Sequence, residues 1–512
     1  MWRGGGRLWL ARTGVAAIGL AGWLVLVPAP VRGHAIGQVF TLPVPLGLYL
    51  AGAALAVAAS FGVAVVVVRP ARGTPNYPTW RIPTGLAGTV STVLQLLGAI
   101  IWVGTIVLGY RVDTISPLPA VLFWIFIWTG LPITAVLLGN PWPSLSPFRT
   151  LFGAFERIAR RAGLDRLDAG LPYPRWIGRF PAIAFLFVAL WAELVLPESE
   201  TPVTVANLML GYTVLTLAGM MLFGRVAWLR HAELFEVLLG WFGRIGPIGR
   251  RVVVESACQD CGEACDPQRC VDCPECAVAA EPGERAAELR PWFAGLSEVQ
   301  HAGWSDAGFI ILALAGVTYD GLQETAFWGS LMQPIFVAVW EAFGALNTVL
   351  IIQTLGLAAV WVVFLAAFTL ATALTRALHD PQRQPPPMGR MVGVYAATLL
   401  PIAAGYLIAH YLTLVIQGVA WLPELLADPL LTVAPPLDWI PVSVVWYLSI
   451  GAIVIGHIVA VLLAHRIALR DSASRPVLAG LPLVLLMIAY TVMSLWIIAA
   501  PITLEPGVVP AP

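Results

Sequence analysis

Charge is scarce in this sequence, and lysine is missing altogether. Only 11% of the 512 residues are charged, and all 29 positive charges belong to arginine. Positive and negative residues balance to a net charge of zero, which gives no electrostatic support for nucleic-acid binding. With 59% hydrophobic residues and a mean hydropathy of +0.82, the chain has too little polar surface for a soluble domain. We therefore expect an integral membrane protein.

Apolar runs of about 20 residues recur along the chain, long enough to cross a hydrocarbon layer of ~30 Å. Backbone exposed to lipid has to satisfy its own hydrogen bonds, so each run is expected to be a helix. The expected fold class is an all-α polytopic membrane protein, a helical bundle of about ten transmembrane helices. The expected spans are 46–69, 84–110, 119–138, 180–197, 203–223, 306–326, 345–375, 391–417, 442–466 and 478–500.

The topology follows from the start of the chain and from the arginines. Residues 1–33 combine a basic head with an apolar stretch, which predicts a signal peptide or an N-terminal anchor. Arginines then gather in alternate loops, which the positive-inside rule assigns to the cytoplasm. We expect a multi-pass protein of the inner (plasma) membrane, with the mature N-terminus and the C-terminus outside. The predicted domains after the signal are a five-helix bundle segment (34–223), a cytoplasmic loop (224–305) and a second bundle segment of about five helices (306–512).

Two cytoplasmic segments are expected to form amphipathic helices along the inner membrane surface. In the first, three prolines precede a helix that starts near Phe148. In the second, Leu234 and Phe235 share an apolar face, with Glu233 and Glu236 on the opposite face. The alternative is that both helices pack on the bundle and have no task of their own.

A cysteine cluster lies in the loop 224–305. All six cysteines of the chain are in it: Cys258, Cys261, Cys265, Cys270, Cys273 and Cys276. A reducing cytoplasm disfavours disulfides, and the two Cys-x2-Cys pairs, one at each end of the cluster, can hold a tetrahedral zinc ion. The two middle cysteines leave open a two-zinc cluster, an iron–sulfur centre, or free or disulfide-paired thiols. We expect zinc to fold a loop that lacks an apolar core, and we expect no catalysis there.

Two histidines stand inside apolar spans, where an ionisable side chain is costly and marks a functional or structural polar site. His410 lies in YLIAHYLTLVIQG, and His457 lies in the next span. On neighbouring helices the two imidazoles could ligate one metal ion or a haem, or carry protons. The alternative is that each is a structural histidine with a hydrogen-bond partner.

A pair of carboxylates forms a second candidate site. Asp320 and Glu324 are four residues apart near the outer end of a span, which puts them on one side of a continuous helix. Asp428, on an outward loop, could join them. Together with His410 and His457, Asp320 and Glu324 would suit a divalent metal that activates water. Asp320, Glu324, His410 and His457 are therefore the candidate catalytic residues. The alternative is that the acids simply end a helix at the interface.

Several segments, in order, resemble the bacterial integral membrane proteins of the fenitrothion hydrolase family. They are HAIGQVFTLPVPLGLYL, NPWPSLSPFRTL, GWSDAGFIILALAGVTYDGLQET, YLIAHY, DPL and GHIVAVLLAHRIAL. The resemblance implies hydrolysis of an organophosphorus ester, and it assigns no role to individual residues. The six-cysteine insert departs from the family.

Two functions are therefore expected to compete. One is metal-assisted hydrolysis of organophosphorus esters, and the other is a non-enzymatic membrane protein that binds or transports a metal ion or haem through its histidines. The lipid bilayer is the expected partner, a second membrane subunit is a further candidate, and nucleic acid is not expected.

Overall fold

The computed structural model describes residues 46–68, 77–82, 87–252, 270–272, 276, 285–299, 302–472 and 475–499. In this part of the chain helices dominate, and nine of them are long and apolar enough to cross a membrane. The predicted all-α bundle is thereby confirmed. The signal or anchor expected at 1–33 lies outside the described residues, as do Cys258, Cys261, Cys265 and Cys273.

Each of the ten predicted spans overlaps a helical stretch of the structure. Most are single helices: α2 (Leu46–Val67), α3 (Ala87–Arg111), α8 (Phe180–Leu194), α9 (Pro202–Phe223), α13 (Trp304–Gln323), α15 (Ala345–Ala377), α18 (Val442–Asp471) and α19 (Pro476–Ala499). The helix α2 is strongly apolar and carries no charged residue. These helices form because in lipid only regular hydrogen bonding within the segment satisfies the backbone.

Two further spans change helix type along their length. The first joins α4 (Leu118–Ala120), the π-helix η1 (Val121–Gly130) and α5 (Leu131–Leu137). The second joins α16 (Met388–Ala396), the 3₁₀ turn η7 (Ala397–Leu399) and α17 (Leu400–Ala427). In both spans the change comes just before a proline, Pro132 or Pro401, which lacks the backbone N–H of a regular α-helix.

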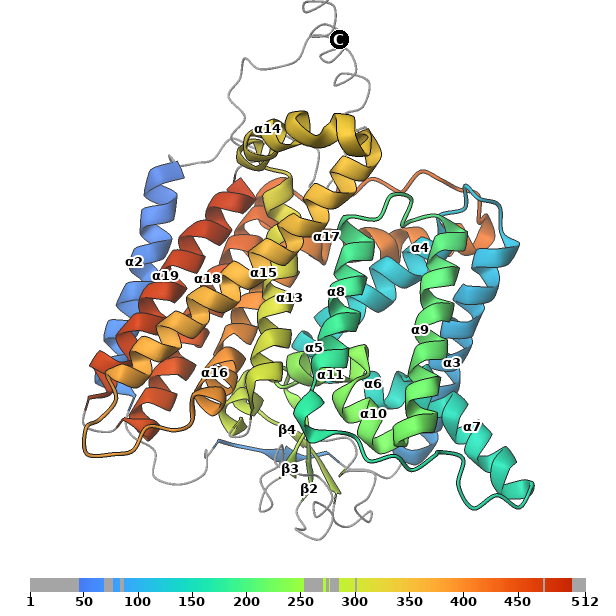
Figure 1. Ribbon diagram of the computed structural model, residues 1–512, viewed down its shortest axis with the longest axis horizontal. Helices are drawn as coiled ribbons and strands as arrows, with labels where there is room; N and C mark the ends of the chain where they lie inside the picture. The colour runs from blue at the N-terminus through green and yellow to red at the C-terminus, as the bar shows by residue number, and fades with distance from the viewer. Residues whose placement is uncertain are drawn as a thin grey trace, which may run out of the picture.

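The spans fall into two groups that meet along one boundary (Figure 1). The first group contains α3, the α4–η1–α5 span, α8 and α9, and the second contains α2, α13, α15, the α16–α17 span, α18 and α19. At the boundary α8 packs against α13, and η1 packs against α17. Residues from both groups therefore meet in the middle of the bundle.

Glycines bring α17 and α18 into close contact within the second group. A Cβ on Gly405 would lie 2.4 Å from the carbonyl oxygen of Ala452, and one on Gly456 would lie 2.3 Å from that of Pro401. Ser449 also donates a hydrogen bond to the Ala409 carbonyl, at 3.0 Å. Such small residues let two membrane helices approach backbone to backbone, and here they fix the register of the pair.

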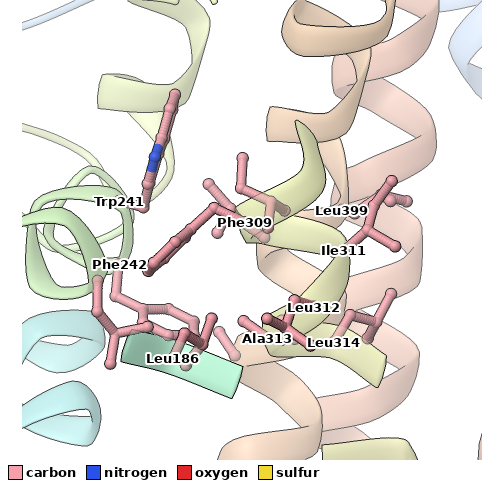
Figure 2. Close-up of a cluster of buried hydrophobic side chains, with 14 of the residues drawn as sticks. Leu186, Trp241, Phe242, Phe309, Ile311, Leu312, Ala313, Leu314 and Leu399 are labelled. Atoms are coloured by element: carbon pink, nitrogen blue, oxygen red, sulfur yellow. The ribbon is translucent and has the colours of Figure 1, made fainter. Parts of the chain in front are cut away.

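The helix α11 (Leu234–Gly243) corrects one prediction. It was expected to lie on the membrane surface with a polar face, but it is buried inside the bundle on nearly every side. Figure 2 shows Trp241 and Phe242 of this helix beside Phe309 of α13 and Leu186 of α8. The physical reason is that Glu233 accepts hydrogen bonds and Glu236 forms an ion pair inside the protein, so no face needs water.

Those partners surround Glu233, which caps the start of α11. One carboxylate oxygen accepts hydrogen bonds from Trp142 Nε1 at 2.9 Å and from the backbone N–H of Glu236 at 2.7 Å. The other accepts from the Tyr212 hydroxyl and from the Phe235 N–H. The Glu236 side chain forms an ion pair with Arg149, at 3.0 Å.

Short helices connect the spans. They are α6 (Trp142–Leu145), α7 (Pro147–Arg161), η2 (Arg175–Ile177), α10 (Arg225–His231), η6 (Ala294–Glu298) and α14 (Ala326–Phe343). The first helix expected at the membrane surface is α7, which buries Phe148 and Phe152 and exposes Phe155 and Ile158. The region of α14 was expected to be a loop, and the structure instead has a helix there.

A small antiparallel sheet and α14 lie at opposite ends of the bundle, here called the sheet end and the α14 end (Figure 1). The strands β1 (Trp80–Arg81), β2 (Ile248–Val252), β3 (Cys270–Val271) and β4 (Arg285–Leu289) follow the order β1-β4-β2-β3. Ion pairs between Arg251 and Glu288, and between Arg290 and Asp272, connect the strands and their loop.

Candidate functional site

An acid–imidazole pair lies inside the second helix group. Asp320 is in the last turn of α13, and His410 is in the middle of α17. The His410 Nε2 atom lies 2.8 Å from a carboxylate oxygen of Asp320. The two side chains are 15% and 14% exposed, so the pair is mostly buried.

Tyr411 connects this pair to the first helix group. Its hydroxyl donates a hydrogen bond to Asp320, at 2.7 Å, and lies 3.4 Å from a carboxylate oxygen of Glu193 on α8. The other Glu193 oxygen accepts a hydrogen bond of 2.8 Å from Trp128 Nε1 on η1. A continuous polar chain, Trp128–Glu193–Tyr411–Asp320–His410, therefore crosses the boundary between the two groups.

The Tyr411 hydroxyl has one proton for two neighbouring carboxylates. A phenol has one proton, and Tyr411 gives it to Asp320 at the shorter distance. The contact between the Tyr411 oxygen and Glu193, at 3.4 Å, is longer than an ordinary O–H···O hydrogen bond. Two acceptor oxygens face each other there unless Glu193 carries a proton, in which case its O–H can donate to the phenol oxygen. The chain thus has a defined place for one extra proton.

The π-helix η1 sets the position of Trp128. At its end the backbone N–H of Leu131 bonds to the carbonyl of Phe126, five residues earlier, and Thr129 Oγ1 donates to the carbonyl of Trp124. The wider turn rotates the residues that follow it relative to an α-helix. Such segments are rare and are often found at functional sites.

Glu324, another predicted site residue, follows the last residue of α13, one turn after Asp320. It is exposed, and it lies close enough to Asp320 and His410 to interact with both electrostatically. The structure therefore brings three of the four predicted residues, Asp320, Glu324 and His410, to one region. Asp428 does not join them: it is exposed at the end of α17 and accepts a hydrogen bond from the Leu430 N–H.

His457 lies apart from this site. Its Nδ1 atom is 2.9 Å from the carbonyl oxygen of Ile453, one turn earlier in α18. The contact of Gly456 with Pro401 puts His457 at the level of residue 400 of α17, ten residues before His410. At 1.5 Å per residue this is roughly 15 Å along the helix, so the two imidazoles cannot ligate one ion. Among the described residues, no group of three or more His, Cys, Asp or Glu is arranged to hold a metal ion.

Of the cysteine cluster, the structure describes the side chain of Cys276 and the backbone of Cys270 in β3. Cys276 is buried and disulfide-bonded, so its sulfur is not the free thiolate expected for zinc. The zinc site as a whole remains a prediction.

Glu193, Tyr411 and Trp128 were not among the site residues predicted from the sequence. Glu193 is the only charged residue in α8. An ionisable side chain inside an apolar span is costly, which is the reason for selecting His410, and the same reason applies to Glu193. Tyr411 and Trp128 gave no such signal, because tyrosine and tryptophan are common in membrane helices. Their role depends on how the helices are rotated against each other.

The site carries three carboxyl groups, one imidazole and one phenol, with no arginine in direct contact among the described residues. Such a set attracts protons and cations, and it disfavours anions. Comparison of the chain with protein-family models, curated proteins and solved structures gives no match.

Proposed function

We propose that this integral membrane protein takes up and releases protons at the Glu193–Tyr411–Asp320–His410 cluster, and that it uses them to move a small cation across the membrane. The observation that carries the proposal is the chain of polar contacts across the boundary of the two helix groups, from Glu193 through Tyr411 and Asp320 to His410. Its unfilled place for a proton lies between Glu193, from one group, and Tyr411, from the other.

The position of the cluster supports the transport part of the proposal. In membrane transporters, binding sites are commonly found where two helix groups meet near interruptions of the helices. Here the boundary helices include a π-helix on one side, and the α16–α17 span with its 3₁₀ turn on the other. A proton on Glu193 adds a bond between the groups, and loss of that proton puts two oxygens in repulsion. Protonation therefore changes how strongly the groups are held together.

Infrared difference spectroscopy of the protein in lipid vesicles tests the proton site. A carboxyl band that appears on acidification should disappear in Glu193→Gln and shift in Asp320→Asn. Glu424→Gln is the matched control, because Glu424 is an exposed acid on the same helix as His410. A titrating band that is the same in Glu193→Gln and in the wild type would contradict the proposal.

A second candidate is hydrolysis of an apolar phosphotriester, in line with the resemblance to fenitrothion hydrolase. The observation that favours it is the pairing of Asp320 with one ring nitrogen of His410, which orients the imidazole as a general base for water. Turnover of a phosphotriester by the wild type and its loss in His410→Ala would support hydrolysis.

Metal and haem binding by the membrane histidines is tested with the same purified protein. Elemental analysis reports a bound metal, and the absorption spectrum reports haem or copper. Stoichiometric metal that is lost in His410→Ala would favour metal-assisted hydrolysis over proton-driven transport.

A further inference from the structure

Several buried side chains of the second helix group have polar atoms without partners, among them His457, His465 and Tyr406. His457 Nε2, both ring nitrogens of His465 and the Tyr406 hydroxyl make no hydrogen bond to any described residue. The three side chains are 0%, 2% and 0% exposed. His465 packs edge-on against Phe61 of α2. Leaving such groups unsatisfied costs a few kcal/mol each, so they need partners that the protein does not supply.

The three residues form a series that leads to the candidate site. His465 is two turns from the sheet end of α18, where Ser472 accepts a hydrogen bond from the Asp380 N–H. His457 is two turns further into the membrane, about 12 Å away along the helix axis. Next to it, Gly456 contacts Pro401 at the start of α17.

Tyr406 continues this series toward the site. Its ring lies 6.5 Å from the ring of His410, one turn later in α17. Its hydroxyl would be 3.2 Å from a Cβ built on Gly321, the residue after Asp320. The series therefore ends beside the Asp320–His410 pair.

No Asp, Glu, Arg or His of the surrounding helices satisfies these groups. The helices packed against α18 include α2, α17 and α19. Neither α2 nor α19 contains an Asp, Glu, Arg or His, and α17 contributes only His410 and Glu424, both toward its far end. The aromatic ring of Phe61, which packs against His465, has no group that could satisfy its ring nitrogens, and a Cβ on Gly480 would meet nothing closer than Ala468 at 3.8 Å. Buried polar groups without protein partners are usually satisfied by bound water.

We infer that His465, His457 and Tyr406, linked by bound water molecules, form a proton path from the sheet end to the Asp320–His410 pair. The inference rests on the proposed function, because it supplies the protons that the cluster exchanges. Each step transfers one proton between water and a ring nitrogen or hydroxyl, and no electron moves. His457 takes and returns its proton on Nε2, since Nδ1 is engaged with the Ile453 carbonyl.

The test measures how fast the cluster is protonated. Vesicles that contain the wild type, His457→Phe or His465→Phe receive a pH jump on one side at a time, and the infrared carboxyl band of Glu193 is followed in time. A jump on the sheet side should give protonation slower by about tenfold or more in both variants. A jump on the α14 side should give wild-type rates, and the equilibrium titration should not change.

His231→Phe is the control, since it removes an imidazole from α10, outside this series. Wild-type rates from both sides in both variants would overturn the path and leave the proton site intact. Absence of any titrating band in the wild type would instead remove the proposed function.

A second measurement does not depend on the folding of variants. Radiolytic hydroxyl-radical labelling modifies residues that touch bound water, even when they are buried. The wild type should be labelled at His457, His465 and Tyr406, and not at Phe368, which is equally buried in α15. Absence of label at both histidines would also overturn the path.

Discussion

The imidazole of His410 and the carboxylate of Asp320 join α17 to α13 through a contact of 2.8 Å. Because both side chains are largely buried, removing one partner leaves the other in an apolar setting without compensation. We expect Asp320→Asn to lower the free energy of unfolding by roughly 2 kcal/mol, the partial exposure of the pair making the loss smaller than for a sealed one.

A double-mutant cycle with His410→Gln checks this pair. The two substitutions together should cost less than the sum of the single changes, by about 0.5–3 kcal/mol, as measured by unfolding in detergent. Additive effects would mean that the contact does not stabilise the fold. Glu424→Gln should leave stability close to that of the wild type.

The glycine contact between α17 and α18 gives a second prediction. Gly456→Ala forces a methyl group to within 2.3 Å of the Pro401 carbonyl oxygen, and backbone cannot move aside easily. We expect a loss of about 1–3 kcal/mol in unfolding free energy. Gly451→Ala, in the same helix with nothing within 4 Å, should be neutral or slightly stabilising. Equal effects of the two substitutions would contradict this account.

A third prediction concerns pH and the buried Glu233. Burial, with a smaller contribution from the nearby Glu236 carboxylate, raises the pKa of this carboxyl from 4.5 to about 7, although the hydrogen bonds from Tyr212 and from two backbone N–H groups lower it. The folded protein therefore holds this proton more tightly than the unfolded chain does. Stability from this group is fully present below pH 4.5, and it is lost as the pH rises to about 7.

Thermal unfolding of the wild type across this pH window should show that loss, on the order of 3 kcal/mol. Glu233→Gln cannot ionise, so its stability should change less over the same window. Glu156→Gln, at a half-buried acid paired with Arg225, is the control and should keep the wild-type slope. A slope in Glu233→Gln as steep as that of the wild type would rule out Glu233 as its origin.

The cysteine cluster gives a fourth prediction. Purified under reducing conditions, the protein should lose the Cys276 disulfide and bind about one zinc ion per chain. Elemental analysis and a free-thiol count measure both changes. Cys258→Ser together with Cys261→Ser should lower the zinc content, whereas a zinc-free reduced protein would leave the cysteines as a disulfide framework.

The sequence predicted the spans well because each depends on local composition alone. It missed α14, where Gly329 and Pro334 interrupt the apolar run that marks a span. It also gave α11 a polar face, since nothing local shows that Glu233 is enclosed by Trp142 and Tyr212.

The candidate site was predicted only in part, because single residues can be recognised from local sequence but their contacts cannot. His410 and Asp320 were recognisable as costly groups in lipid, and Glu193 could have been found in the same way. Their meeting depends on the rotation and depth of three helices, which no local pattern encodes. His457 is an example. Like His410 it is an imidazole inside an apolar span, but the register of α17 and α18 that Gly456 imposes puts it at another depth in the membrane.

The close glycine contacts between α17 and α18 also restrict how this protein can change shape. With Gly405 and Gly456 seated against carbonyl groups, sliding of α17 along α18 would drive backbone into backbone. The two helices must then rock as a rigid body, and any opening has to occur on their opposite flank, where α8 and η1 meet α13 and α17. A hinge of that kind would pull Glu193 away from Tyr411 first.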